Sequence, residues 1–289
     1  MNHSKTKKIF AVLCACSTLF VSGCDSLYEP PIVAEPQIAA RTMSQDLLAS
    51  LPPAKQNVAV AVYDFQDQTG QMAPNDAFAS YSRAVTQGGL AILTKALLDA
   101  ADHRWFDVIE RGGLKDILQE RQLIKSMRAE YLGPDGQPLG NIMPMIYAGL
   151  ILEGGIVSYE SNIITGGAGA KYLGIGGDTK YRRDIVTVYL RVVNSQTGQV
   201  MLSVNTSKTI YSSAINASVF RFVAFDKLLE IETGFTSNEP PQFAVRQAIE
   251  MAVYSTIMEG AIKNLWEFAD PVAGEKAMRE YLMRRDGKA

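Results

Sequence analysis

Residues 185–210 read IVTVYLRVVNSQTGQVMLSVNTSKTI, and this stretch sets the architecture expected for the rest of the chain. Its two halves, 185–193 and 200–210, are rich in β-branched residues, which favours strands. Between them lies Ser195-Gln196-Thr197-Gly198, whose small and polar residues indicate a tight chain reversal. The stretch therefore predicts two antiparallel strands joined as a hairpin.

Strand and helix patterns alternate on both sides of this hairpin. Leucines at positions 90, 93, 97 and 98 have helical spacing, and so do the apolar residues at 114, 117, 118 and 123. The patterns predict strands over 57–65, 105–109 and 150–159, and helices over 87–101, from 114 to 123, and over 241–266. This alternation predicts a compact α/β domain.

The segment before the hairpin, 161–183, does not fit that domain. It reads SNIITGGAGAKYLGIGGDTKYRR and is rich in glycine. A phosphate-binding loop would need a Gly-Lys-Ser/Thr ending and a following helix, and the segment has neither. Glycine within strands marks bends or close backbone approach, so we interpret 161–183 as strand structure instead.

The segment after the hairpin, 213–237, alternates in the same way. Phe220 and Phe222 share one face of its first half, and Leu229, Ile231 and Phe235 share one face of its second half. Two runs of about 10 residues, apolar on one face and with aromatics near the ends, suit a membrane β-hairpin. An amphipathic hairpin on the surface of a soluble sheet fits equally well. Because a barrel needs about eight strands, a membrane interpretation requires a ring of subunits.

The N-terminus carries an export signal. Lysines precede an apolar run from Ile9 to Phe20, which is too short to span a bilayer. The run ends in Val21-Ser22-Gly23-Cys24, a pattern that resembles the lipobox of bacterial lipoproteins. We therefore expect cleavage before Cys24 and its modification by N-acyl and S-diacylglycerol lipid, with no other cofactor.

The charged and reactive residues exclude several function classes. The formal net charge of −2 does not indicate a surface that binds nucleic acid. The other two cysteines, Cys14 and Cys16, lie in the signal, which excludes thiolate metal sites in the mature chain. His103 is the single histidine left after cleavage, and its Asp-His-Arg-Trp context indicates a surface turn rather than a catalytic base. We predict no enzyme, no metal site and no catalytic residue.

Long motifs spread over 57–266 connect the chain with a known family. They are Asp67-x-Thr69-Gly70-Gln71, Ala84-Val85-x-Gln87, Arg104-Trp105-Phe106, Glu110-Arg111, Tyr159-Glu160-Ser161-Asn162, Gly166-Gly167-x-Gly169-Ala170-x-Tyr172-x-Gly174-Ile175-Gly176, Arg191-Val192-Val193-Asn194, Ser203-Val204-Asn205-Thr206-Ser207-Lys208-Thr209-Ile210, Phe220-Arg221-Phe222 and Thr236-Ser237-Asn238-Glu239-Pro240. On these motifs the chain resembles the CsgG/HfaB family of curli secretion lipoproteins.

The resemblance implies a homo-oligomer of about nine subunits, each giving two transmembrane β-hairpins to one large shared barrel beneath which the α/β domains form a periplasmic collar. It also implies an outer-membrane channel through which unfolded amyloid subunits diffuse outward without ATP. The expected partners are those unfolded subunits, a periplasmic capping or encounter factor, an extracellular assembly factor and membrane lipid, with no nucleic acid.

The resemblance further implies a pore constriction in the loop 71–83. In this sequence the residues at the pore-lining positions are Asn75, Asp76, Phe78, Ser80 and Tyr81. A polar and aromatic loop repeated around a ring forms a girdle that passes an extended chain and excludes a folded one. Asp178, Glu230 and Glu232 are expected to face the lumen, and the residues expected at the lipid or in the aromatic girdles are Phe220, Phe222, Phe225, Leu229, Ile231 and Phe235.

These expectations divide the chain into consecutive segments: a signal peptide, 1–23; a lipidated tether, 24–53, in which 44–51 can form a short helix; the first part of the periplasmic domain, 54–160; hairpin 1, 161–183; periplasmic strands, 184–212; hairpin 2, 213–237; and C-terminal helices, 238–289. Asp25 conflicts with an outer-membrane location, because aspartate after the lipidated cysteine resembles an inner-membrane retention signal. Two alternatives stay open: a holdfast- or adhesin-anchoring lipoprotein of the same family, and a periplasmic lipoprotein that binds peptidoglycan or protein without a pore.

Overall fold

The computed structural model describes residues 41–287 apart from 71, 74–81, 84–85, 134–135, 138, 141, 166–179, 217–218 and 224–239. Its main feature is a mixed sheet of the strands β4 (Phe106–Glu110), β1 (Val58–Asp67), β5 (Leu150–Thr165), β6 (Lys180–Asn194), β7 (Val200–Asn216) and β8 (Val219–Val223). The strands lie side by side in that order, with β1 parallel to both β4 and β5 and the remaining pairs antiparallel. The predicted α/β sheet domain is confirmed.

The hairpin predicted from residues 185–210 is confirmed as β6 and β7. Its turn is closed by backbone bonds in which Gly198 donates to Asn194 and Asn194 donates to Gln199, each at 2.9 Å. Gly198 has φ of 71°, a conformation that glycine adopts without steric cost. Both strands extend beyond the predicted bounds, so the hairpin is longer than its β-branched centre indicates.

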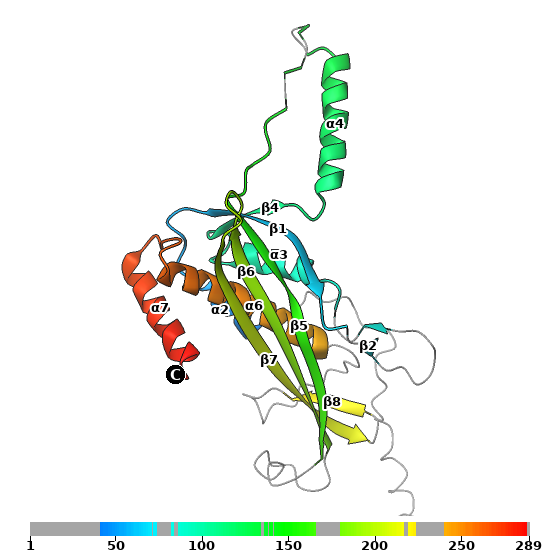
Figure 1. The fold of residues 1–289 in the computed structure, drawn as a ribbon, viewed down its shortest axis with the longest axis vertical. Helices are drawn as coiled ribbons and strands as arrows, with labels where there is room; N and C mark the ends of the chain where they lie inside the picture. The colour runs from blue at the N-terminus through cyan, green and yellow to red at the C-terminus, as the bar shows by residue number, and fades with distance from the viewer. Residues whose placement is uncertain are drawn as a thin grey trace, which may run out of the picture. The chain divides into compact units, whose positions relative to one another are not determined.

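Two of the described helices pack directly on this sheet, and a third packs on those two. The helices are α2 (Met43–Ala49), α3 (Gly89–Asp99), α4 (Leu114–Glu130), α6 (Pro240–Ile262) and α7 (Pro271–Arg285). Helix α6 packs on β6 and β7, α3 packs on β1 and β4, and α2 packs on α6 and α3 (Figure 1). The core between the layers includes Trp105, Ile156, Leu190, Ile249 and Ile257, all fully buried or nearly so. No helix in the described ranges is long and apolar enough to cross a membrane.

Helix α6 ends earlier than the predicted helix over 241–266. The chain leaves the helix after Ile262, and Asn264 adopts the left-handed φ of 58°. Trp266 then folds back against Gly260, where an added Cβ would lie 2.1 Å from the indole ring. The indole N–H donates to the carbonyl oxygen of Ile257 at 2.8 Å. Packing of Trp266 against the helix therefore replaces the last predicted turn.

The last third of the predicted tether, 24–53, is packed against the body. Residues 43–49 form α2, which includes most of the short helix expected near 44–51. Thr42 caps this helix by accepting a 2.9 Å hydrogen bond from the Gln45 N–H, and Leu48 is fully buried. Leu48 and Leu51 in the core explain the difference, since a solvated tether would leave both exposed.

Candidate functional site

The predicted constriction loop leaves the body from the end of β1. Two short strands, β2 (Met72–Ala73) and β3 (Ser82–Arg83), pair antiparallel, with Met72 opposite Arg83 and Ala73 opposite Ser82. These pairs join the two ends of the segment 74–81. The predicted pore residues, Asn75, Asp76, Phe78, Ser80 and Tyr81, lie outside the described residues.

Asp67, the last residue of β1, accepts the hydrogen bonds that form the base of the loop. Its Oδ1 accepts hydrogen bonds from the Thr69 N–H at 2.9 Å and from the Thr69 hydroxyl at 2.6 Å. This Asx turn ends β1, and Gly70 follows with φ of 66°. Gln87, immediately before α3, donates from Nε2 to Asp67 Oδ2 at 3.5 Å. The two family motifs that flank the loop therefore meet at its base.

Phe65 fixes the position of this base against its neighbours. The ring lies between two glycines, and an added Cβ would approach it to 2.6 Å at Gly89 and 2.7 Å at Gly154. At Gly154 the same Cβ would also lie 2.5 Å from the Tyr189 carbonyl oxygen. Only glycine permits α3 and β5 to approach Phe65 this closely. The loop base is thus built on a tightly packed part of the body.

The first predicted hairpin begins as a continuation of the sheet. Pairing of β5 with β6 continues without a break in register from Ser158 opposite Thr187 to Thr165 opposite Lys180. The predicted segment 161–183 thus starts and ends in long strands shared with the body. Asp178 lies outside the described residues, together with the rest of 166–179.

The second predicted hairpin departs from expectation within its first half. We expected one strand over the first ten residues or so of 213–237, but β8 folds back on β7, with Asn216 opposite Val219 and Tyr211 opposite Val223. In a single chain β8 supplies backbone partners to the end of β7, which gives a physical reason for the reversal. Phe220 and Phe222 lie in β8; Phe225, Leu229, Glu230, Ile231, Glu232 and Phe235 lie outside the described residues.

Residues 114–147, called the arm below, form a feature that the sequence did not reveal. They comprise α4 and an extended segment that returns to β5, and no α4 residue is buried (Figure 1). Three arginines hold the return segment: Arg111, Arg121 and Arg128 donate to the carbonyl oxygens of residues 146, 143 and 140 at 2.9, 2.8 and 2.7 Å. These three bonds join the return segment to α4 and to the end of β4, although no residue of α4 is buried in the core.

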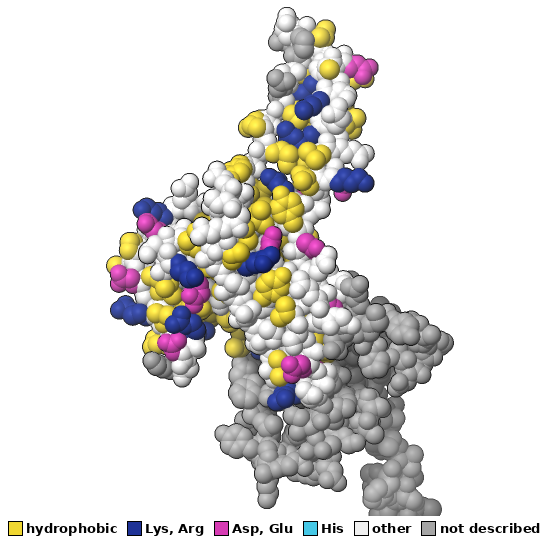
Figure 2. Space-filling model, viewed as in Figure 1, with side chains coloured by type: hydrophobic (Ala, Val, Ile, Leu, Met, Phe, Trp, Pro, Cys, Tyr) yellow, Lys and Arg dark blue, Asp and Glu magenta, His cyan; other side chains and the backbone are white. Residues whose placement is uncertain are grey.

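The arm carries large apolar side chains that its own chain does not cover. Leu118, Leu123 and Met127 on α4 are 50 to 53% exposed, and Met143 and Ile146 on the return segment are 83% and 65% exposed. Figure 2 shows hydrophobic side chains interspersed with arginine and lysine over this part of the chain. A surface of this kind is typical of a protein contact. The helical spacing from 114 to 123 predicts a helix. That spacing would have indicated an exposed apolar surface only if the core had been known to be complete without this helix.

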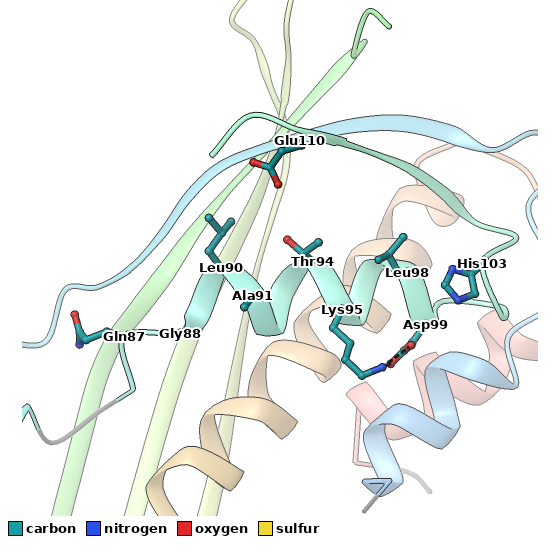
Figure 3. Close-up of a pocket in the computed structure, with 10 residues that line it drawn as sticks. All are labelled: Gln87, Gly88, Leu90, Ala91, Thr94, Lys95, Leu98, Asp99, His103 and Glu110. Carbon is teal, nitrogen blue, oxygen red and sulfur yellow. Dashed lines mark hydrogen bonds and ion pairs between the residues drawn. The ribbon is translucent and has the colours of Figure 1, made fainter. Parts of the chain in front are cut away.

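A shallow groove follows the outer side of α3 (Figure 3). Leu90, Thr94 and Leu98 line it from the helix, and Glu110 lines it from the end of β4. Three of its polar side chains have partners within the body: Lys95 pairs with Asp99 at 2.9 Å, and Glu110 accepts the Gly113 N–H at 2.7 Å.

His103 lies at one end of this groove, exposed, in a turn with φ of 63°. Its prediction as a turn residue is confirmed. Within the described part of the chain, no three His, Cys, Asp or Glu side chains are grouped as metal ligands would be.

Comparison with known proteins identifies the family. The family described as "Curli production assembly/transport component CsgG" matches residues 41–282. Proteins of that name from Salmonella typhimurium and Escherichia coli are 42% and 41% identical to the chain over 255 residues, covering 87% of this chain and 88% of theirs. The protein of that name from Citrobacter koseri is 42% identical over 251 residues, 86% of this chain and 87% of its own.

A crystal structure of the lipoprotein GNA1162 from Neisseria meningitidis is 14% identical and covers 55% of this chain and 86% of its own, with a TM-score of 0.26. That similarity is too low to inform the site. The extent and identity of the matches to the curated relatives are decisive, and the chain belongs to the CsgG family of curli production assembly and transport components.

Proposed function

We propose that the protein is the secretion channel of a curli system. About nine copies form a ring in the outer membrane, and unfolded amyloid subunits diffuse outward through its loop-lined constriction without ATP. The relatives named curli production assembly/transport components support a role in curli export, and they match the chain over nearly their whole length.

The extension of β5 beyond its last pair with β1 is the observation that carries this proposal. Strand β5 pairs with β1 only as far as Ile156, yet it continues beside β6 to Thr165. Among the described residues, no strand lies on the other side of β5 over 160–165. Open backbone groups cannot be left in lipid, whereas strands from a neighbouring copy would pair with them. This edge favours a barrel shared by several copies.

The arm supports contact between copies in the same way. Its exposed leucines and methionines would be covered when neighbouring collars lie side by side in a ring. The arginine bonds to the return segment order this surface in advance, so docking would cost little conformational entropy. Tests of the arm and of the loop are given in the Discussion.

The proposed location is the outer membrane, with Cys24 carrying the lipid and the described α/β domain in the periplasm. Asp25 opposes this location, and we propose that insertion of the barrel overrides the retention signal or that the host sorts lipoproteins by another rule. The client is an unfolded curli-type subunit, accompanied by a periplasmic encounter factor and an extracellular assembly factor.

Single-channel conductance tests the proposal. Full-length protein is purified in detergent and inserted into a planar lipid bilayer, next to the variant Asn162→Pro, which removes a backbone donor from the β5 extension. The matched control is Tyr63→Ser, at an exposed position on the body. We expect discrete, stable, cation-preferring steps from the wild type and the control, and none from Asn162→Pro.

If the protein shows no conductance steps, its oligomeric state distinguishes a closed channel from a periplasmic lipoprotein without a pore. Silence from an inserted ring would indicate a plugged or partner-gated channel and would contradict free diffusion. Silence from a monomer would favour the periplasmic lipoprotein that binds peptidoglycan or protein. Identical steps from Asn162→Pro would contradict the assignment of β5 to the barrel.

A further inference from the structure

A chain of polar side chains crosses the interface between α2 and the helices α3 and α6. Thr42 donates its hydroxyl to Glu250 Oε2, and Arg246 donates from Nε to Glu250 Oε1 at 2.9 Å. Arg246 also donates from Nη2 to Gln45 Oε1 at 2.7 Å. The cap residue Thr42 and the α2 residue Gln45 thus bond to Glu250 and Arg246 of α6. These partners lie about 200 positions later in the chain.

Gln45 extends the polar chain to α3. Its Nε2 donates to Asp99 Oδ2 at 2.7 Å, and Lys95 pairs with the same carboxylate at 2.9 Å. Gln45 therefore bridges the arginine on α6 and the aspartate on α3 with its two amide atoms. The amide oxygen of Gln45 thus contacts α6, and its amide nitrogen contacts α3.

Burying a charged side chain in this interface has a desolvation cost. Glu250 is only 3% exposed, and burial raises the pKa of its carboxyl even though Thr42 and Arg246 donate hydrogen bonds to it. A buried carboxylate is tolerated only while its hydrogen-bond partners remain in place. When α2 leaves, Glu250 loses the Thr42 bond but gains access to water. The polar chain therefore holds α2 only while its hydrogen bonds to the charged groups stay intact.

Besides the polar chain, α2 is held by a backbone bond that the Ala101 N–H donates to the Leu48 carbonyl oxygen at 2.9 Å and by a small apolar surface. Helix α2 has seven residues, which is too short for a helix that is stable in water by itself. Its apolar contribution is mainly Leu48 and Leu51, and its packing is on α3 and α6 rather than on any strand. Loss of α2 would leave the pairing of the sheet unchanged.

The chain after α2 is fastened separately. Pro53 accepts the Ala269 N–H at 2.9 Å, Ala54 forms a bridge with Phe268, and Lys55 donates its N–H to Glu267 at 2.8 Å. These backbone bonds fix residues 53–55 to the segment before α7. Any detachment that begins at the N-terminus would therefore stop at Pro53.

From this arrangement we infer that α2 is a latch, which releases from α3 and α6 as a unit while the sheet remains folded. The inference rests on the proposed lipid anchor at Cys24, because the latch is the last described element before that tether. Release of residues 42–52 would lengthen the tether by roughly 35 to 40 Å when extended. Before the proposed barrel inserts, the latch would thus set how far the body can lie from its anchoring membrane.

Amide hydrogen exchange of the full chain in detergent, read by mass spectrometry, tests the latch. The variant Gln45→Met removes the bridge and keeps a flexible apolar stem, and Thr42→Val removes the link to Glu250. Lys276→Met, in an exposed pair on α7, is the matched control. We expect exchange over residues 43–49 to rise at least tenfold in both latch variants, with exchange in β1 and β6 unchanged and no change in the control.

Two results would overturn the latch. One is unchanged exchange over 43–49 in both variants; the other is a rise there that β1 and β6 share, since it would mean that α2 opens only with global unfolding. If Thr42→Val fails to fold because its helix cap is lost, Gln45→Met alone decides. Bilayer conductance of the same wild-type sample tests the channel separately, so either proposal can fail without the other.

Discussion

Gln87 and Asp67 lie 20 residues apart in sequence, and the Gln87 side-chain amide donates to the Asp67 carboxylate at 3.5 Å. The bond joins the end of β1 to the residue that precedes the N-terminal cap of α3. Both ends of the proposed constriction loop are therefore fixed to the body at one carboxylate. A pore loop positioned in this way would keep its radius while its tip contacts a passing chain.

Replacing Asp67 with alanine should loosen the loop base. The change removes the acceptor of two Thr69 bonds and of the Gln87 bond, and we expect a loss of about 1 to 2 kcal/mol in unfolding free energy. Denaturant unfolding measures the loss, and limited proteolysis measures cleavage within 71–83. Asp107→Ala, which removes one exposed bond to Asn57, is the control. Equal cleavage in both variants would contradict the role given to Asp67.

Gly154→Ala should destabilise the body. The added methyl group would overlap the Phe65 ring and the Tyr189 carbonyl oxygen, and overpacking of this kind costs about 1 to 3 kcal/mol. Thermal unfolding compares the melting temperatures of Gly154→Ala and Gly149→Ala. Gly149→Ala is the control because no atom lies within 4 Å of its added Cβ. Equal melting temperatures would show that Phe65 moves aside without cost.

Charge on the arm should impair assembly without affecting the fold. Leu123→Lys with Met127→Lys places two charges on exposed apolar positions, so the stability of the single chain should change by less than about 0.5 kcal/mol. Mass photometry in detergent should show loss of the ring. Gln122→Lys with Ser126→Lys adds the same charge at exposed polar positions of α4 and should leave assembly intact. Rings from both double variants would exclude the arm as a contact.

Tyr281 should make stability depend on alkaline pH. Burial, followed by the 2.7 Å bond donated to Glu259, raises the pKa of this phenol above its usual value. A folded-state pKa above the unfolded one gives stability that is complete below about pH 10 and is lost as the pH rises through the folded pKa. Denaturant unfolding from pH 8 to 12 should show this loss in the wild type. It should be smaller in Tyr281→Phe and unchanged in the control, Tyr63→Phe; identical slopes in all three would contradict the assignment.

The double variant Phe78→Ala with Tyr81→Ala should widen the proposed constriction. Removing two aromatic rings from each subunit enlarges the girdle, so we expect a higher single-channel conductance. Bilayer recordings beside Tyr63→Ala, on the body, measure the change. Unchanged conductance in the double variant would place the constriction elsewhere.

Local patterns predicted the regular elements well because neighbouring residues determine them. The β-branched runs gave β1, β6 and β7, and leucine spacing gave α3. Prediction failed where distant contacts compete. Trp266 leaves the expected helix to pack on Gly260, and β8 reverses to pair with β7. Of the candidate site, the loop base is described, whereas the five predicted pore residues remain predictions.

The sequence by itself determined the α/β alternation, the central hairpin and the family, since periodicity and long motifs are properties of the chain alone. Only the tertiary structure decided that Asp67 meets Gln87, that α2 docks through Thr42 and Glu250, and that the arm leaves its apolar side chains exposed. The physical reason is the same in each case. Whether a polar group is satisfied or an apolar side chain is covered depends on atoms from distant parts of the chain, which one-dimensional spacing does not encode.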